Sequence, residues 1–470
     1  MTPSPAHIDV FDSTKGIKRL IWTYFWLLIF EGALRKWILP QLSTPLLIVR
    51  DPVLLVCYAV ALRHGRMPWN SFVVATWLLG ILAVAASLLG LMMHSIQSTL
   101  AVTLFGFRAN FLHLPLIFLM ANVLSRKDVE AIGKWLLILV PPMTVLVFMQ
   151  FKSEPTAWIN VGAGASEGGQ IGVAVAGVDK IRPPGMFSYN TGLTSFIALA
   201  AAYLFYHFVK GKVYYRWLGW VAGCSLLAMA AFSVSRSSVA SLVIVAAMTL
   251  VAGLLRTEFM AAAIRVTVVC VAFWLVLETW SAFHEGLSIL QARVEDTEGI
   301  QVGLVDRFVG GFLAPFHFAA STPMLGHGLG KGTNAGAGLL TGSPDFLLAE
   351  GEWSRVVLEL GPVLGFAFIL LRVAIALDAL RIATKKIFEG DILPLLLLGA
   401  SFLSLVQGPF GQPTALGFAV FGIGLCLAAV NDENEENADL KNEPFHQAHS
   451  AQPFVRGRSA YAEILHGGGP

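Results

Sequence analysis

The chain has 470 residues, of which 56% are hydrophobic and 13% are charged, and its mean hydropathy is +0.69. An ordinary soluble domain has roughly 25% charged residues, so this composition indicates an integral membrane protein. A formal net charge of +2, with no block of Lys and Arg, excludes a nucleic-acid-binding protein that works through a strongly basic surface.

The sequence gives no sign of a metal or a cofactor. Its cysteines lie in apolar runs without CxxC spacing, which predicts neither a disulfide framework nor a zinc site; they are Cys57, Cys224, Cys270 and Cys426. There is no HExxH motif and no DxD pair of the kind that holds a cation against a nucleotide sugar. We therefore expect no bound metal and no cofactor.

Apolar runs close to the roughly 20 residues needed to cross hydrocarbon predict an all-α polytopic membrane protein with about 12 transmembrane helices. The membrane domain is expected over 20–430, between a cytoplasmic N-terminus (1–19) and a polar, disordered cytoplasmic tail (431–470). The first run carries charged residues where a signal peptide would have small ones, so we keep it as a span. The predicted centres are Leu28, Leu54, Leu82, Leu112, Val140, Ile197, Gly223, Val245, Phe273, Gly365, Gly399 and Gly422.

Lys and Arg are unevenly divided between the connectors of these spans. The richer connectors are predicted to be cytoplasmic by the positive-inside rule, and they are 1–19, 63–71, 122–134, 209–216, 255–265 and 379–391. The poorer set is 40–43, 93–98, 152–184, 234–237, 283–355 and 409–413. Both termini are therefore expected in the cytoplasm. Two extended loops, 152–184 and 283–355, are expected on the outer face, the larger between spans 9 and 10.

The stretch 306–365 is the most polar part of the expected membrane domain. A loop of this length is seldom passive, so we expect any chemistry here. Its string GHGLGKGT fits no P-loop, because Leu325 and Gly332 stand at the first and last positions, and no GxGxxG, because Lys331 replaces the last glycine. What remains is either a turn that approaches a phosphate or sugar closely or a simple tight turn. The charged and titratable residues of the stretch include Arg307, His327, Lys331, Asp345, Glu350, Glu352, Arg355 and Glu359.

Three arginines stand at positions that we expect on the outer face. They are Arg182 in KIRPPGMFSYNTG, Arg236 in FSVSRSSVAS and Arg307 in DRFVGG. A guanidinium group offers a fork of donors that matches phosphate oxygens, and it stays charged at any working pH. If they converge, they form a site for an anionic lipid-linked substrate; otherwise they anchor helices at the membrane surface.

Several charges fall inside the predicted spans, where an unpaired ion costs at least about 2.5 kcal/mol. Glu31 and Arg35 have the i, i+4 spacing of a pair on one helix face. Arg50 and Asp51 are adjacent and must find partners elsewhere or lie near the interface, and Arg108 has no acidic neighbour in the sequence. These residues are either structural pairs and anchors or the lining of a cleft.

An ordered set of short motifs resembles the O-antigen ligase and O-antigen polymerase superfamily, particularly its exopolysaccharide-polymerase-like branch. The motifs cover much of 20–430 and are EGALRKWILP, FRANFLHLPLIF, RPPGMFSYNTGL, SVSRSS, PMLGHGLGKGTN and ELGPVLG. The resemblance implies a metal-independent glycosyltransferase of the bacterial cytoplasmic membrane that acts in exopolysaccharide or lipopolysaccharide biosynthesis. Its donor would be an undecaprenyl-diphosphate-linked glycan and its acceptor a glycan or a lipid, alongside other polysaccharide assembly proteins.

The resemblance also implies roles for single residues. Cations would bind the diphosphate, and here these would be Arg182, Arg236, Arg307, Lys331 and Arg355. A histidine eleven residues before a GxxG-type helix start would activate the acceptor, but this chain has Glu350 eleven residues before Gly361, and GPVLG is one residue longer than GxxG. The expected base is therefore Glu350 or Glu352, or else His327 from the Gly-rich turn. The plainer alternative is that both carboxylates pair with Arg355 or favour the helix dipole.

A transporter or flippase for a glycan or another solute is the alternative function. Such proteins place polar groups near the bilayer midplane in broken helices and often have repeated halves. This chain instead concentrates its polar residues in two loops that we expect on one side, which favours the enzyme.

Overall fold

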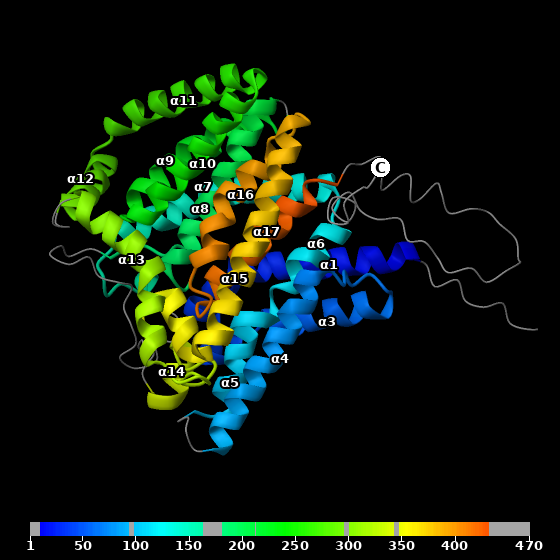
Figure 1. The fold of residues 1–470 in the computed structure, drawn as a ribbon. Coiled ribbons are helices and arrows are strands. Elements are labelled where there is room, and N and C mark those ends of the chain that lie inside the picture. The colour runs from blue at the N-terminus through cyan, green and yellow to red at the C-terminus, as the bar shows by residue number, and fades with distance from the viewer. Residues whose placement is uncertain are drawn as a thin grey trace, which may run out of the picture.

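The computed structural model describes residues 10–93, 98–162, 181–211, 213–295, 300–342 and 347–431, and every regular element in these ranges is a helix (Figure 1). Of these, η1 and η3 are π-helical and η2 and η4 are 3-10 turns. In chain order the elements are α1 (Val10–Ala33), η1 (Leu34–Ile38), η2 (Pro40–Leu42), α2 (Ser43–Leu46), α3 (Arg50–Arg63), α4 (Ser71–Met92), α5 (Leu100–Phe107), η3 (Arg108–Leu112), α6 (Pro115–Val123), α7 (Arg126–Lys152), η4 (Trp158–Asn160), α8 (Asn190–Lys210), α9 (Arg216–Phe232), α10 (Arg236–Leu255), α11 (Thr257–Glu278), α12 (Ser281–Glu295), α13 (Ile300–Ser321), α14 (Asn334–Thr341), α15 (Glu352–Phe388), α16 (Leu393–Gln407) and α17 (Pro413–Ala428).

Seven helical segments in the described part are long and apolar enough to cross a membrane, and α9, α16 and α17 are apolar but shorter. The seven are Pro40–Arg63, Ser71–Met92, Leu100–Val123, Arg126–Lys152, Asn190–Lys210, Arg236–Leu255 and Glu352–Phe388. All twelve predicted centres lie on helices, the two remaining ones on α1 and α11. The all-α architecture of a membrane protein is therefore confirmed, while the number of crossings stays a prediction.

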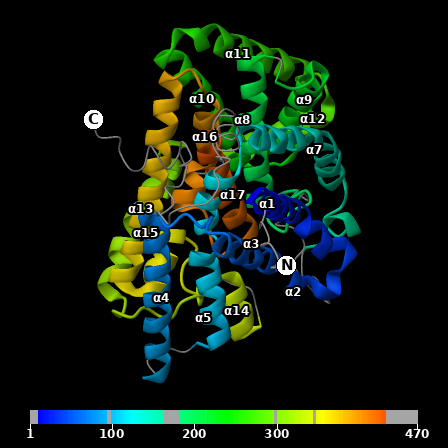
Figure 2. The same cartoon turned by 90° about the vertical axis from the view of Figure 1, so that its right-hand side faces the viewer.

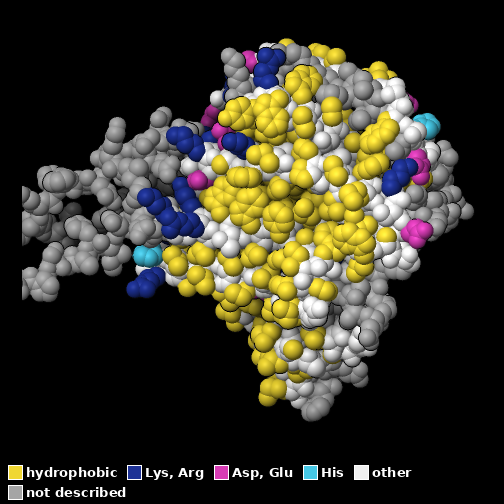
Figure 3. Space-filling view, turned by 180° about the vertical axis from the view of Figure 1, so that it is seen from behind, with side chains coloured by type: hydrophobic (Ala, Val, Ile, Leu, Met, Phe, Trp, Pro, Cys, Tyr) yellow, Lys and Arg dark blue, Asp and Glu magenta, His cyan; other side chains and the backbone are white. Residues whose placement is uncertain are grey.

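The surface is that of a protein surrounded by lipid. Leu254, Leu370 and Ile81, from three different helices, are each more than half exposed. Figure 3 shows a broad hydrophobic surface on one face of the molecule, with Lys and Arg gathered along one edge of it. Water-soluble monomers rarely expose contiguous apolar patches of more than a few hundred Å².

The helices α8, α16 and α17 form the centre of the fold. Every residue of α17 is buried, and most of α8 is buried as well. Small residues allow this close packing: a Cβ on Gly422 of α17 would clash with the side chain of Ser401 on α16. α1 runs across the view in Figure 1 and is seen close to end-on in Figure 2, where it lies beside α3; it also contacts α17.

The predicted outer loops differ from the expectation in their secondary structure. The segment 283–355 is largely helical, because it includes most of α12, all of α13 and α14, and the start of α15. Its Gly and polar content argued against a membrane span, but a helix packed against other helices tolerates such residues. In 152–184, the described part holds the short turn η4, and 163–180 lie outside the described residues. The same is true of the expected tail, of which only Asn431 is described.

The helix α15 is broken at Gly361, and the break leaves two backbone carbonyls without a helical donor. Gly361 has φ +79° and ψ 168°, which is outside the helical region, and the next residue is Pro362. Proline has no N–H, so the carbonyl of Leu358, four residues earlier, loses its helical donor. That carbonyl and the carbonyl of Glu359 must therefore be satisfied from outside the helix.

Candidate functional site

Arg182 and Arg236, which 53 residues separate, belong to neighbouring elements and are near enough for their charges to interact; we refer to them as the arginine pair. Arg182 belongs to a coil segment, residues 181–189, that leads into α8, and Arg236 begins α10. Burial lowers the pKa of Arg182, and the positive charge of Arg236 lowers it further. The Nε of Arg182 is buried without a hydrogen-bond partner, and no carboxylate pairs with Arg182 among the described residues. An anion bound here would therefore stabilise both guanidinium groups.

Hydroxyl groups surround the start of α10 beside the arginine pair. Thr194 of α8 lies with its Oγ1 2.9 Å from the Oγ of Ser238 and 3.4 Å from the Oγ of Ser237. The turn before α10 is strained, because Val234 has φ +47° and a β-branched residue rarely adopts a positive φ. Such strain costs about 1–3 kcal/mol and concentrates at functional sites.

Arg307, the third predicted arginine, lies on α13, and its side chain is outside the described part of the structure. One turn further along, Gly311 packs so closely on α16 that a Cβ there would lie 2.5 Å from the Nε2 of Gln407. This region of α13 therefore passes the end of α16. Whether the guanidinium of Arg307 joins the arginine pair stays a prediction.

The structure brings Glu352 and Arg355 together in a buried group that we call the α15 ion cluster, with Glu359 and Arg372. Glu352 accepts two hydrogen bonds of 2.9 Å from Arg355 and one of 2.7 Å from Arg372. Arg355 also forms an ion pair with Glu359 at 2.8 Å and donates to Asn110 Oδ1 at 2.9 Å. All four cluster members are at least 94% buried. The alternative that Glu352 pairs with Arg355 is therefore what the geometry shows.

The Gly-rich turn, residues 325–333, is bound to the broken part of α15. The amides of His327 and Gly328 donate to the orphaned carbonyls of Leu358 and Glu359, at 2.7 and 3.2 Å. The Glu359 carboxylate accepts from two further amides of the turn, those of Gly330 at 3.1 Å and Gly332 at 2.8 Å. A nest of backbone amides is an anion site, and here the protein's own carboxylate occupies it. Of the two interpretations left open by the sequence, the structure therefore favours a tight structural turn.

This packing leads to a prediction about stability. Gly106 of α5 lies against Gly330 so closely that a Cβ on Gly106 would overlap the Gly330 backbone. We expect Gly106→Ala to lower the melting temperature of the detergent-solubilised protein, at a cost of about 1–3 kcal/mol from overpacking. Gly338→Ala on α14 is the matched control, because a Cβ there meets nothing within 4 Å. Equal melting temperatures for the two variants would contradict the prediction.

His327, Lys331 and Glu350 lie outside the α15 ion cluster. The side chains of His327 and Lys331 are partly exposed, and Glu350 is exposed two residues before α15 begins. Partial burial and the charge of Lys331 lower the pKa of His327 below its usual 6.5. The imidazole is therefore neutral at pH 7 and able to accept a proton.

The turn between α16 and α17, residues 408–412, contacts α15, α8 and the Gly-rich turn; we call it the hairpin turn. Arg372 of α15 donates to its first carbonyl at 2.8 Å, and Thr191 of α8 donates to Gln412 Oε1 at 2.7 Å. Thr333, the last residue of the Gly-rich turn, packs against it. The helices on either side have 15 and 16 residues, or about 23 Å at 1.5 Å per residue, which is shorter than about 30 Å of hydrocarbon. Both helices are thus shorter than a full crossing, and Phe410 and Gly411 of the hairpin turn between them are buried.

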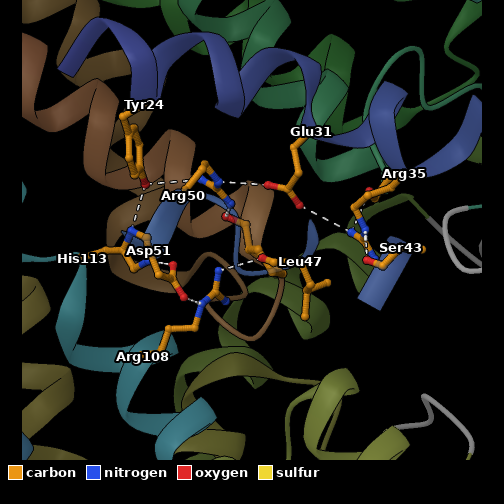
Figure 4. A network of polar contacts seen from close by, with 11 residues as sticks. Tyr24, Glu31, Arg35, Ser43, Leu47, Arg50, Asp51, Arg108 and His113 are labelled. Carbon is orange, nitrogen blue, oxygen red and sulfur yellow. Dashed lines mark hydrogen bonds and ion pairs between the residues drawn. The ribbon is translucent and has the colours of Figure 1, made fainter. Parts of the chain in front are cut away.

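A second buried network joins α1, α3, η3 and α17; Figure 4 shows it. Glu31 accepts from Arg50 at 2.9 Å and pairs with Arg35 at 3.5 Å, which confirms the pair predicted from the i, i+4 spacing. Arg50 also donates to the carbonyl of Pro413, the first residue of α17, at 2.6 Å. Its partners come from elsewhere in the chain, as its position next to Asp51 required.

Asp51 is the acidic residue at the centre of the other half of this network. It pairs with Arg108 and with His113, whose Nε2 lies 3.1 Å from Asp51 Oδ1. Tyr24 Oη accepts from Arg50 at 3.3 Å and lies 2.9 Å from His113 Nδ1, so Tyr24 and His113 link the two halves of the network. Arg108 showed no partner in the sequence because its acid is 57 residues away.

Sequence reasoning also missed Gln150 of α7 and assigned no role to Lys36 of η1. Gln150 is fully buried and bonds the coil segment that carries Arg182, as Lys36 does. A glutamine inside an apolar run was the available signal for Gln150.

A search with protein-family models finds no match to this chain, and a search of curated proteins finds none either. The family resemblance seen in the short motifs therefore stays an expectation.

Proposed function

We propose that this protein is a membrane glycosyltransferase that polymerises or ligates undecaprenyl-diphosphate-linked oligosaccharide on the outer face of the bacterial cytoplasmic membrane. One observation carries the proposal: the arginine pair brings together the coil segment before α8 and the start of α10, and Arg182 has no carboxylate partner among the described residues. A diphosphate at the head of a membrane lipid supplies the missing negative charge. The motif resemblance supports the same donor.

The chemistry follows from the charges. Transfer of a sugar from a lipid diphosphate places positive charge on the anomeric carbon and negative charge on the leaving diphosphate. Guanidinium groups held in place beforehand stabilise that negative charge as it forms. Because the donor is already energised by its diphosphate, the reaction needs no nucleotide, which agrees with the absence of nucleotide motifs in the sequence.

The acceptor hydroxyl must lose a proton as it attacks. Glu352 is held between two guanidinium groups, so it acts in this proposal as a structural counter-ion and not as the base. His327 and Glu350 are accessible, and His327 is neutral at pH 7, so His327 is the preferred base and Glu350 the second candidate. Lys331, beside His327, would face the same anionic substrate.

The proposal requires the arginine pair and the Gly-rich turn to face away from the cytoplasm. The Lys/Arg distribution between the connectors supports this orientation. A reporter fused at Gly338 should therefore report the outer compartment, and one fused at Lys386 the cytoplasm. A cytoplasmic signal at Gly338 would place the candidate site on the wrong side of the membrane.

A transporter or flippase remains the second candidate, and the network in Figure 4 is the observation that favours it. Buried charges and broken helices at membrane depth are typical of transporters. Each acid of this network is paired, however, which is also what a fixed scaffold requires. Purified protein in sealed vesicles decides between them: a flippase moves lipid-linked oligosaccharide across the bilayer without lengthening it.

The proposed function is tested by deletion in the native host and by reconstitution. Loss of long surface polysaccharide, with accumulation of lipid-linked single repeat units, would support the polymerase. Loss of polysaccharide attachment, with long lipid-linked chains retained, would support the ligase. Normal polysaccharide and normal intermediates in the deletion strain would overturn both.

A further inference from the structure

The coil segment that carries Arg182 is anchored at Gly185. The Gly185 amide donates to Gln150 Oε1 at 2.9 Å. Its carbonyl accepts from Gln150 Nε2 at 3.2 Å and from Lys36 Nζ at 3.0 Å. Side chains from α7 and η1 therefore satisfy both backbone polar groups of a single residue. Gly185 has φ +60°, so a glycine is needed at this anchor.

Both anchoring side chains are withdrawn from water. Gln150 is 0% exposed and Lys36 is 4% exposed. The Gln150 amide also donates to the carbonyl of Ile159, at 3.1 Å, so all its polar atoms are bonded. Hydrogen bonds in such a low-dielectric environment are strong, and leaving one of their partners unpaired is costly. These contacts therefore hold the segment rigidly.

Only two residues, Pro183 and Pro184, separate the anchor from Arg182. Each proline ring restricts φ to about −65°, which makes the connection stiff. With its amide oriented to satisfy both groups, Asn190 donates to the carbonyls of Arg182 and Pro183, at 3.2 and 3.0 Å. A displacement of Gly185 is therefore passed on to Arg182.

We infer that Lys36 and Gln150 are positioning residues that hold Arg182 beside Arg236 for the diphosphate of the donor. The inference rests on the proposed function for its ligand, but the anchoring itself does not depend on that function. Neither residue needs to touch the substrate, because both act through Gly185.

The test uses the full chain in lipid nanodiscs with undecaprenyl diphosphate as the probe. We expect Gln150→Leu and Lys36→Met each to weaken binding of the probe by about tenfold, the effect of losing one buried positioning contact. The control is Thr144→Val on the same helix, which removes hydrogen bonds to the carbonyls of Val140 and Ser225 and leaves the segment untouched. It should bind like the wild type.

Two further readouts separate positioning from general destabilisation. In an Arg182→Ala background, Gln150→Leu should weaken binding no further, because its effect passes through the missing guanidinium. Hydrogen exchange at the Gly185 amide should be faster in Gln150→Leu than in Thr144→Val. If Gln150→Leu does not accumulate, Gln150→Glu replaces it, since it keeps the acceptor for the amide and loses the donor; it should bind more weakly than the wild type.

The outcomes are distinguishable. If the wild type binds the probe, Arg182→Ala weakens binding and both anchor variants bind normally, the positioning inference is overturned and the proposed function stands. If the wild type does not bind the probe, the proposed function fails. Amide exchange at Gly185 then decides whether Lys36 and Gln150 anchor the segment: unchanged exchange overturns the inference, and faster exchange supports it.

Discussion

Arg236→Ala is expected to abolish polysaccharide assembly while the protein still inserts and folds. The residue begins α10, beside Arg182 and a group of hydroxyls, where a fixed cation suits a diphosphate. Removing one preorganised donor for the negative charge of a transition state lowers turnover about 10²–10³-fold. The loss should appear in kcat with purified protein and lipid-linked donor, and Arg182→Ala should behave in the same way.

Charge alone does not account for this expectation. Arg236→Lys should rescue poorly, because an ammonium group cannot make the bidentate contact of a guanidinium. The control is Lys152→Ala, which removes an exposed cation at the end of α7 that we also predict to be on the outer side. Near-normal activity in Arg236→Ala, or an equal loss in Lys152→Ala, would argue against a specific diphosphate site.

Local sequence patterns predicted the helices well because each span is a long apolar run, and every predicted centre lies on a helix. The pair of Glu31 and Arg35 was predictable for the same reason, since both lie on one helix turn. By contrast, the partners of Arg108 and Arg372 depend on how distant helices pack. Asp51 is 57 residues from Arg108, and the carbonyls that Arg372 binds belong to the last turn of α16 and to the hairpin turn.

The Gly-rich turn shows why part of the candidate site could not be derived from sequence. Its glycines correctly indicated a tight turn, and three of them, Gly326, Gly328 and Gly330, have positive φ values. Composition could not tell which anion its amides bind. Pro362 removes one helical donor in α15, and the turn supplies the replacement while Glu359 fills the amide nest. That solution appears only when the two segments are brought together.

The identity of the base gives the second large prediction, and three variants separate the candidates. Glu352→Gln should act on folding, because Arg355 and Arg372 would lose the carboxylate between them. Breaking a buried ion pair costs about 3–5 kcal/mol, so we expect a low yield of folded protein. Glu350→Gln alters an exposed side chain and should fold normally.

His327→Ala should fold, because the hydrogen bond from residue 327 to the carbonyl of Leu358 comes from the backbone. The variant should lower turnover by about 10²-fold or more while donor binding is retained.

The pH dependence of turnover in the wild type gives a further test of His327 as the base. Burial and Lys331 lower the pKa of His327 below 6.5, so the imidazole is neutral at pH 7 and gains a proton only at lower pH. Turnover should therefore be flat near neutrality and fall as the pH drops below 6.5. If Glu350→Gln loses turnover and His327→Ala keeps it, the exposed carboxylate is the base; if both keep it, acceptor deprotonation does not use this face of the protein.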